Sequence, residues 1–209
     1  MKRLRLPMIA LAGGWLAVTG CSPLAPRPDP SKYFLLAPVS DTAPASQIRP
    51  ALSPALTIGV GPIDFPDYLR RPDVVTRTGP TQIDISNVNV WGEPLDKNFE
   101  RVLRENLARL LDTQRIEKYP WSRKTEVDYQ IEIDVQRFET SSDGQSQLVA
   151  RWIIKDGKSG KDLYASETRA VTAVGAGDTV ASAALSNDLA TLSRDIASQV
   201  ASLSQRRAL

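Results

Sequence analysis

The strictest pattern in this chain is an alternation of apolar and polar residues from position 127 to position 135. Its apolar members are Val127, Tyr129, Ile131, Ile133 and Val135. Because successive side chains of a strand point to opposite faces, the alternation predicts a β-strand with one face on a core and one in water. Such a strand needs a covering layer, which limits the chain to folds in which a sheet packs against other elements.

Two more strands are expected to follow in an antiparallel meander. The second runs from Leu163 to Val174, and the first contains the alternating apolar residues Leu148, Ala150, Trp152 and Ile154. Between them lie the dipeptides Asp156-Gly157 and Ser159-Gly160, which are typical of tight turns. Phe138 breaks the alternation of the strand that begins at Val127, which indicates a β-bulge.

Two amphipathic helices are predicted from apolar residues at three- and four-residue steps. The first begins near Glu93-Pro94, since proline is tolerated in a first helical turn, and its stripe is Leu95, Phe99, Val102, Leu103, Leu107, Leu110 and Leu111. The second runs from about Asp178 to Leu203, with the stripe Leu185, Leu189, Leu192, Ile196, Val200 and Leu203. The stripes either pack on the sheet or bind a partner helix.

Four shorter runs complete the expected sheet. They are a short edge strand at Tyr33–Leu36 and strands at Leu56–Val60, Val74–Thr78 and Ile83–Val90. The order of strands, helix, strands and helix predicts an α+β fold. We expect a mainly antiparallel sheet with two amphipathic helices packed on one face, forming a single domain over residues 55–205.

The N-terminus reads as a secretory leader. Three basic residues precede an apolar run from Leu6 to Val18, which is shorter than the roughly 20 residues that a membrane span needs. The run ends in Val18-Thr19-Gly20-Cys21, which resembles the bacterial lipobox. We therefore expect that residues 1–20 are removed as a lipoprotein signal peptide and that Cys21 is acylated. Ser22, where aspartate would signal inner-membrane retention, favours a lipid-anchored protein of the outer membrane that faces the periplasm.

Residues 21–54 are expected to form the lipidated cysteine and a proline-rich stalk that includes the short edge strand. Eight of the fifteen prolines fall between Pro23 and Pro54. A proline-rich segment stays extended at about 3.1 Å per residue, so the stretch 22–30 could hold the domain roughly 30 Å from the lipid. Without the leader the chain has 23 basic and 24 acidic residues, and this balance argues against nucleic-acid binding.

The residue inventory also limits the chemistry. The chain has no histidine and one cysteine, which the lipid uses. This inventory excludes catalysis by Ser-His-Asp or Cys-His groups and zinc sites built from histidine or several cysteines. The nearest carboxylate pair, Asp64 with Asp67, is better explained as two turn residues, because spacing in the sequence does not define a pair in space. We expect no enzyme activity, no metal and no cofactor.

One segment, Gly61–Pro72, carries three prolines and two aromatic residues between strands. A rigid loop of this kind loses little entropy on binding and suits a docking surface, but its aromatic side chains could instead fold onto the core. The same two interpretations apply to the junction before the first helix. The candidate docking residues are Pro62, Asp64, Phe65, Tyr68, Leu69, Arg71, Trp91, Glu93 and Pro94.

From Tyr33 to Leu203 the chain resembles the PqiC family of ABC-type transport auxiliary lipoproteins, which belongs to the paraquat-inducible system. The markers are Tyr33 with Leu35, the segments Ile58–Pro62 and Asp67–Arg71, and the segment Val90–Leu95, in which Gly92 replaces a more usual alanine. The resemblance implies a non-enzymatic lipoprotein that acts with a mammalian-cell-entry (MCE) tunnel protein and its membrane permease in phospholipid transport and envelope integrity. Ring-like self-association would suit a tubular partner. A periplasmic lipid or solute carrier and an outer-membrane assembly lipoprotein remain alternatives.

Overall fold

The computed structural model describes residues 29–39, 56–175 and 180–207. The expected leader, Cys21 and most of the expected stalk lie outside these residues. The chain divides into two units, Met1–Pro30 and Ser31–Leu209. All the elements below belong to the second unit.

The described residues form an eight-stranded mixed sheet and two long helices, which confirms the predicted α+β class. The strands are β1 (Lys32–Phe34), β2 (Ile58–Asp64), β3 (Asp73–Arg77), β4 (Ile83–Trp91), β5 (Ile116–Lys118), β6 (Tyr129–Ser141), β7 (Gln145–Asp156) and β8 (Asp162–Ala173). The helices are α1 (Leu95–Leu110) and α2 (Val180–Arg207), with a short 3-10 turn, η2 (Asp67–Leu69), between β2 and β3. The expected start of the second helix, near Asp178, lies outside the described residues.

The long strand β6 organises the sheet. It pairs with β7 in an antiparallel manner along its whole length, and β7 continues to β8 as the expected meander. On its other edge β6 pairs in parallel with β2 over its first half and with β3 at its far end. Beyond β3 the sheet continues through β4 to β1, which lies at the edge as expected. These parallel pairings and strand β5 were not predicted.

A register shift interrupts the pairing of β6 with β7 between Val135 and Arg137. Val135 faces Ala150 and Arg137 faces Val149, so Gln136 is the extra residue of a bulge. The bulge changes the alternation and turns Phe138 into the core, where it is 1% exposed. The bulge expected at this place is confirmed.

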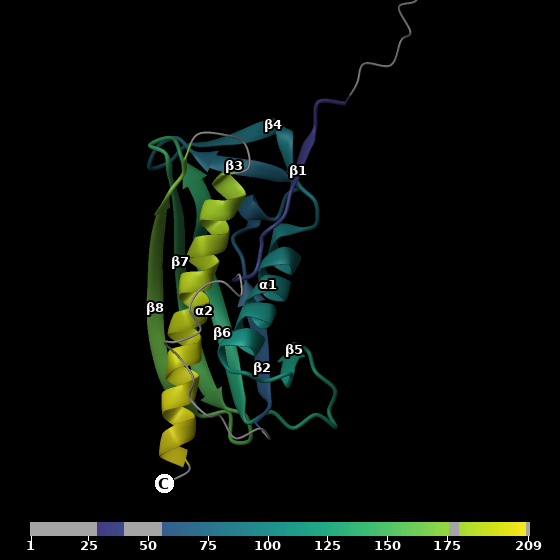
Figure 1. Ribbon diagram of the computed structural model, residues 1–209, viewed down its shortest axis with the longest axis vertical. Helices are drawn as coiled ribbons and strands as arrows, with labels where there is room; N and C mark the ends of the chain where they lie inside the picture. Colours follow the sequence, from purple (N-terminus) through teal and green to yellow (C-terminus); the bar gives the residue numbers. More distant parts are fainter. Residues whose placement is uncertain (1–28, 40–55, 176–179, 208–209) are drawn as a thin grey trace, which may run out of the picture. The chain divides into compact units, whose positions relative to one another are not determined.

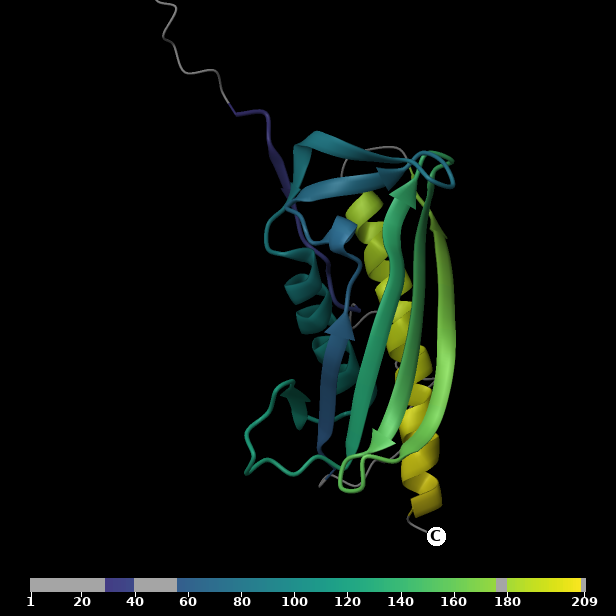
Figure 2. The same ribbon diagram turned by 180° about the vertical axis from the view of Figure 1, so that it is seen from behind.

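Both helices cover the same face of the sheet (Figures 1 and 2). Helix α2 packs on β6, β7 and β8, and α1 packs on β2 and on α2. Of the two interpretations of their apolar stripes, packing on the sheet therefore holds, and the stripes form the core. Three aromatic rings, Phe65, Phe99 and Phe138, meet edge to face at its centre, with centroid separations of 5.0–6.5 Å. No helix of the described part of the chain is long and apolar enough to span a membrane.

The segment Leu36–Val39, which we call the strap, follows β1 and is held by polar side chains of both helices. Asn98 and Asn106 of α1 accept hydrogen bonds from the N–H groups of its first and last residues, at 2.6 and 2.8 Å. Ser186 of α2 accepts one from its second residue at 3.0 Å. The remaining residue, Pro38, has no N–H to satisfy. The side chains of α1 and α2 thus bind every N–H of the strap.

Candidate functional site

The loop Gly61–Pro72 divides its side chains between the core and the surface. Phe65 and Leu69 are buried, and the ring of Phe65 lies 5.0 Å from that of Phe99. Pro62 and Asp64 are exposed at the end of β2. The loop was expected either to present a docking surface or to fold its side chains onto the core. Phe65 and Leu69 fold onto the core, so their side chains are not accessible to a partner.

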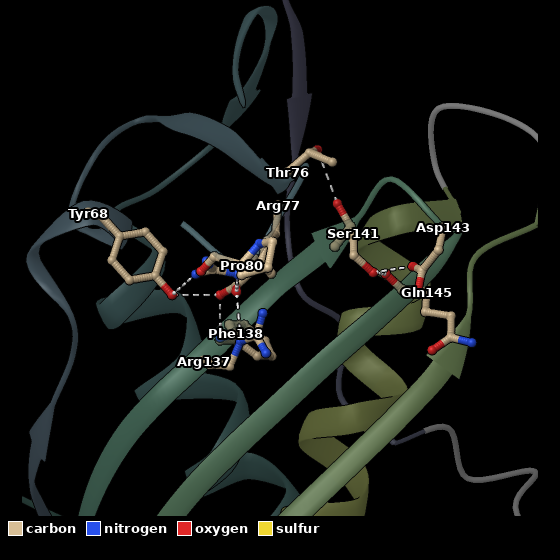
Figure 3. Close-up of polar contacts among 11 residues, drawn as sticks. Tyr68, Thr76, Arg77, Pro80, Arg137, Phe138, Ser141, Asp143 and Gln145 are labelled. Atoms are coloured by element: carbon tan, nitrogen blue, oxygen red, sulfur yellow. Dashed lines mark hydrogen bonds and ion pairs between the residues drawn. The ribbon is translucent and has the colours of Figure 1, made fainter. Parts of the chain in front are cut away.

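Tyr68 is bound into a buried cluster around Glu139, whose side chain is 1% exposed. The Tyr68 hydroxyl donates to Glu139 Oε2 at 2.8 Å, and Arg77 Nε and Arg137 Nε donate to Glu139 Oε1 at 2.7 and 3.1 Å. The backbone N–H of Phe138 donates to Oε2 at 3.0 Å. Figure 3 shows Tyr68 and Arg77 directed towards each other beside Arg137. We call these groups the Glu139 cluster.

The Glu139 cluster connects three separate elements of the fold, one turn and two strands. Tyr68 belongs to η2, Arg77 to the end of β3, and Glu139 to β6 after its bulge. Burial, together with the hydrogen bond to Glu139, raises the pKa of Tyr68 to about 12. Tyr68 therefore stays a neutral donor at physiological pH, and it fixes the turn that carries the two following arginines.

Those arginines form one wall of a groove with a volume of about 330 Å³. Arg70, Arg71 and Pro72 line one side, and the segment Trp91–Asp96 lines the other. The backbone N–H of Trp91 donates to the Pro72 carbonyl at 2.7 Å, which holds the two walls together. We call this feature the Arg71–Trp91 groove.

Each wall of the groove is fixed by hydrogen bonds. Arg71 Nε donates to the Tyr68 carbonyl at 3.0 Å, and Arg70 Nε donates to the Phe65 carbonyl at 3.2 Å. On the opposite wall Trp91 is buried, whereas Pro94 is exposed and immediately precedes α1. The groove therefore offers the exposed Pro94 beside two guanidinium groups, and the side chain of Trp91 belongs to the core beneath it.

Glu93 provides the acidic part of the groove. Arg101 Nη2 donates to its carboxylate at 2.8 Å, and the Asn98 amide also donates to it. The hydrogen bond from Arg101, followed by that from Asn98, lowers the pKa of Glu93. Because Asn98 also accepts the N–H of Leu36, the groove is connected to the strap by a single side chain.

The groove has the chemistry of a binding surface. Asp64 and Asp67 are both exposed, and Asp67 lies 3.8 Å from Arg70 in a solvent-exposed ion pair. Among the described residues no group of three histidine, cysteine, aspartate or glutamate side chains is placed to hold a metal ion. Guanidinium and carboxylate groups side by side suit a polypeptide segment with mixed charge.

Four candidate docking residues line the groove, namely Arg71, Trp91, Glu93 and Pro94. Tyr68 supports it from the Glu139 cluster. Sequence reasoning did not single out Glu139, because a carboxylate in a strand gives no sign that it is buried. It also missed Asn98 and Asn106, although polar residues on the apolar side of a helix are a usable signal for buried hydrogen bonds.

Residues 34–197 match the family described as the ABC-type transport auxiliary lipoprotein component. The match covers most of the chain, which therefore belongs to this family. Membership implies a membrane-anchored lipoprotein of the cell envelope that associates with an ABC transporter, and an auxiliary component is expected to be non-enzymatic. The resemblance seen in the sequence is confirmed at this level.

Solved structures show the same fold. Protein XCC0632 from Xanthomonas campestris has a TM-score of 0.68 at 13% identity, with 85% of this chain and 99% of that one covered. An uncharacterized protein has a TM-score of 0.64 at 20% identity, with 81% and 98% covered. None of the curated proteins matches the chain significantly.

Proposed function

We propose that this protein is the accessory lipoprotein of an MCE-type intermembrane phospholipid transport system. It would dock at the outer-membrane end of a periplasmic lipid tunnel, work with the MCE-domain tunnel protein and its membrane permease, and support envelope integrity. Its membership of the auxiliary lipoprotein family supports the class of system. The MCE partner is inferred from the resemblance of the marker segments.

The observation that carries the proposal is the Arg71–Trp91 groove. It brings together the two marker segments, Asp67–Arg71 and Val90–Leu95, which are about twenty residues apart in the chain. Neither segment contributes catalytic groups, and both present rigid side chains at one surface. A tunnel protein that contacts this groove would bind a preformed site and pay little in conformational entropy.

Anchoring belongs to the same proposal. Cys21 would carry the acyl groups after removal of residues 1–20, and Ser22 would direct the lipoprotein to the periplasmic leaflet of the outer membrane. A single acyl chain gives only marginal attachment, so the several chains of a lipoprotein cysteine are needed for a durable anchor. A ring of copies would match a tubular partner.

Co-purification from membranes tests the proposed partner. The native protein should recover an MCE-domain protein, and Arg71→Glu should reduce that recovery strongly because it reverses a charge in the groove. Arg123→Glu, an exposed arginine in the loop after β5, is the matched control and should leave recovery unchanged. Recovery of unrelated machinery alone, or equal recovery with both variants, would reject docking at the groove.

Site-specific photocrosslinking gives an independent test of the docking face. A photoreactive residue in place of exposed Pro94 should form an adduct with the tunnel protein in cells, whereas one in place of exposed Lys124 should not. A carrier predicts a different result, which is a stoichiometric lipid, other than the acyl groups of Cys21, in the mass spectrum of gently extracted protein. The aromatic packing of Phe65, Phe99 and Phe138 between helices and sheet weighs against a carrier cavity there.

A further inference from the structure

Three large apolar side chains are exposed on β1, on the residue that follows it and on its partner strand β4. Tyr33 is 66% exposed, Leu35 52% and Val88 38%. Strand β1 pairs with β4 in parallel, with Tyr33 opposite the partly buried Val90. We call Tyr33, Leu35 and Val88 the β1–β4 patch.

The strand register keeps the patch exposed. Phe34 and its pairing partner Trp91 both point into the core, with 9% and 6% exposure. Since successive residues of a strand face opposite sides, Tyr33 and Leu35 must face away from the core. Turning them inwards would expose Phe34 and the buried Leu36. The apolar surface is therefore a stable feature of the native fold.

The patch also adjoins the Arg71–Trp91 groove. A Cβ atom added at Gly92, which lines the groove, would lie 3.3 Å from Leu35 Cδ2. The Gly92 N–H donates to the Phe34 carbonyl at 2.8 Å, which continues the contact between these segments. Patch and groove thus form neighbouring parts of one surface, apolar in the first and charged in the second.

The length of the chain sets an upper limit on the distance to the expected anchor, and an extended stalk holds the domain at that limit only where it stands upright on the membrane instead of lying along it. Strand β1 begins at Lys32, eleven residues after Cys21. Eleven residues span at most about 40 Å even when fully extended. An acylated Cys21 therefore keeps the start of β1, next to the patch, within this distance of its lipid at all times. Confinement of this kind raises the local concentration of the surface and makes a weak contact effective.

We infer that the β1–β4 patch rests on the lipid surface of the membrane that holds the acylated Cys21. This inference rests on the anchoring in the proposed function. Tyrosine suits the membrane–water interface because its ring is apolar and its hydroxyl can remain hydrated, and Leu35 and Val88 add apolar area. The contact turns the groove towards the headgroup region, next to the leaflet that the transport system serves.

A lipid surface fits the patch better than a second protein chain does. A stable protein interface needs about 800 Å² from each partner, and three partly exposed side chains supply much less. A bilayer needs no shape complementarity and is already tethered. Because the patch carries no charge, its contact should persist at high salt, unlike electrostatic adsorption to anionic lipids.

A single fluorescent probe tests this contact in the lipidated protein. The chain has one cysteine, and acylation blocks its thiol, so Leu35→Cys introduces the only reactive thiol. We would label it with an environment-sensitive fluorophore and reconstitute the protein into phosphatidylethanolamine and phosphatidylglycerol vesicles. Leu163→Cys is the matched control, because Leu163 is 38% exposed near the start of β8, at the opposite end of the sheet from β1.

The probe at position 35 should shift to shorter wavelength and should be quenched by lipids that carry a spin label near the headgroup. Interfacial elements bury their apolar face only about 5–10 Å, so labels deep in the acyl chains should quench less. The probe at position 163 should show neither effect, and 0.5 M salt should change nothing. Adding Tyr33→Ser should weaken quenching at position 35.

Other outcomes overturn the inference in distinct ways. A wavelength shift without lipid quenching would mean that protein, such as a second copy, covers the patch. Equal quenching at positions 35 and 163 would mean that the domain has no preferred face on the membrane. Absence of quenching in protein whose acylation is verified by intact mass rejects only the patch, whereas an unmodified Cys21 also rejects the proposed anchoring.

Discussion

Replacing Glu139 with leucine should be among the most destabilising single changes in the described part of the fold. The side chain is 1% exposed and accepts from Arg77, Arg137 and Tyr68. Leucine has a similar size, so the loss comes from polar groups left without their acceptor. Removing one partner of a buried ion pair costs about 3–5 kcal/mol.

The exposure of the two arginines determines where in that range the loss of stability should fall. The side chain of Arg77 is 18% exposed and that of Arg137 is 36% exposed, so both guanidinium groups can regain some water. We therefore expect the lower end, about 3 kcal/mol, for Glu139→Leu. Glu139→Gln keeps an acceptor oxygen and loses only the charge, which should cost about 1–2 kcal/mol. Arg137→Ala, at the exposed edge of the cluster, should cost about 1 kcal/mol or less.

Equilibrium urea unfolding, followed by tryptophan fluorescence, measures these differences. A double-mutant cycle with Arg77→Leu isolates the pair, since the second substitution removes the cation that Glu139→Leu leaves unpaired. The combined variant should be more stable than the sum of the two single losses predicts. A loss below about 1 kcal/mol for Glu139→Leu, or strict additivity in the cycle, would refute a buried cluster that holds the groove.

Four further predictions follow from other contacts. Burial and the hydrogen bond to Glu139 raise the pKa of Tyr68, so an absorbance titration should show a tyrosine that ionises near pH 12, and Tyr68→Phe should lack this step. The stability that Tyr68 contributes below pH 10 should be lost as the pH rises through 12. Burial raises the pKa of Asp188, so the stability that Asp188 contributes should be lost as the pH rises from about 4. In urea unfolding, the stability of the wild type relative to Asp188→Asn should therefore fall over that pH range. Asn98→Ala should cost about 1–2 kcal/mol because it leaves a strap N–H unsatisfied, whereas Ala at exposed Asn187 should change unfolding little. Thermal unfolding of Gly157→Ala should show a loss of about 3 kcal/mol, since the added Cβ would lie 1.9 Å from a backbone carbonyl oxygen.

Much of the fold follows from local sequence patterns. The alternation around Ile131 and Ile133 predicted β6 and its buried face, and both residues are at most 3% exposed. The apolar stripe from Leu95 predicted α1 with its start one or two residues early. These features are accessible because side-chain direction repeats every two residues in a strand and every 3.6 in a helix, whatever the partner is.

The order of the strands in the sheet was harder to predict from the sequence. Strand β5 has only three residues, Ile116–Lys118, too few for an alternation to be recognised. The parallel pairing of β2 with β6 joins segments about seventy residues apart. A periodic pattern shows which face of a strand is apolar, and it does not identify the strand that completes its hydrogen bonds. The register of distant strands is decided by the whole core at once.

The candidate site shows the same division. The sequence by itself determined which segments are rigid and rich in aromatic and proline residues, and it led to the family. Only the tertiary structure turned Phe65 and Leu69 into the core and placed Arg71 beside Trp91 across one groove. It also buried Glu139 beneath Tyr68. The physical reason is that composition and period are properties of a segment, whereas burial, charge pairing and a groove arise only when segments far apart in the chain exclude water together.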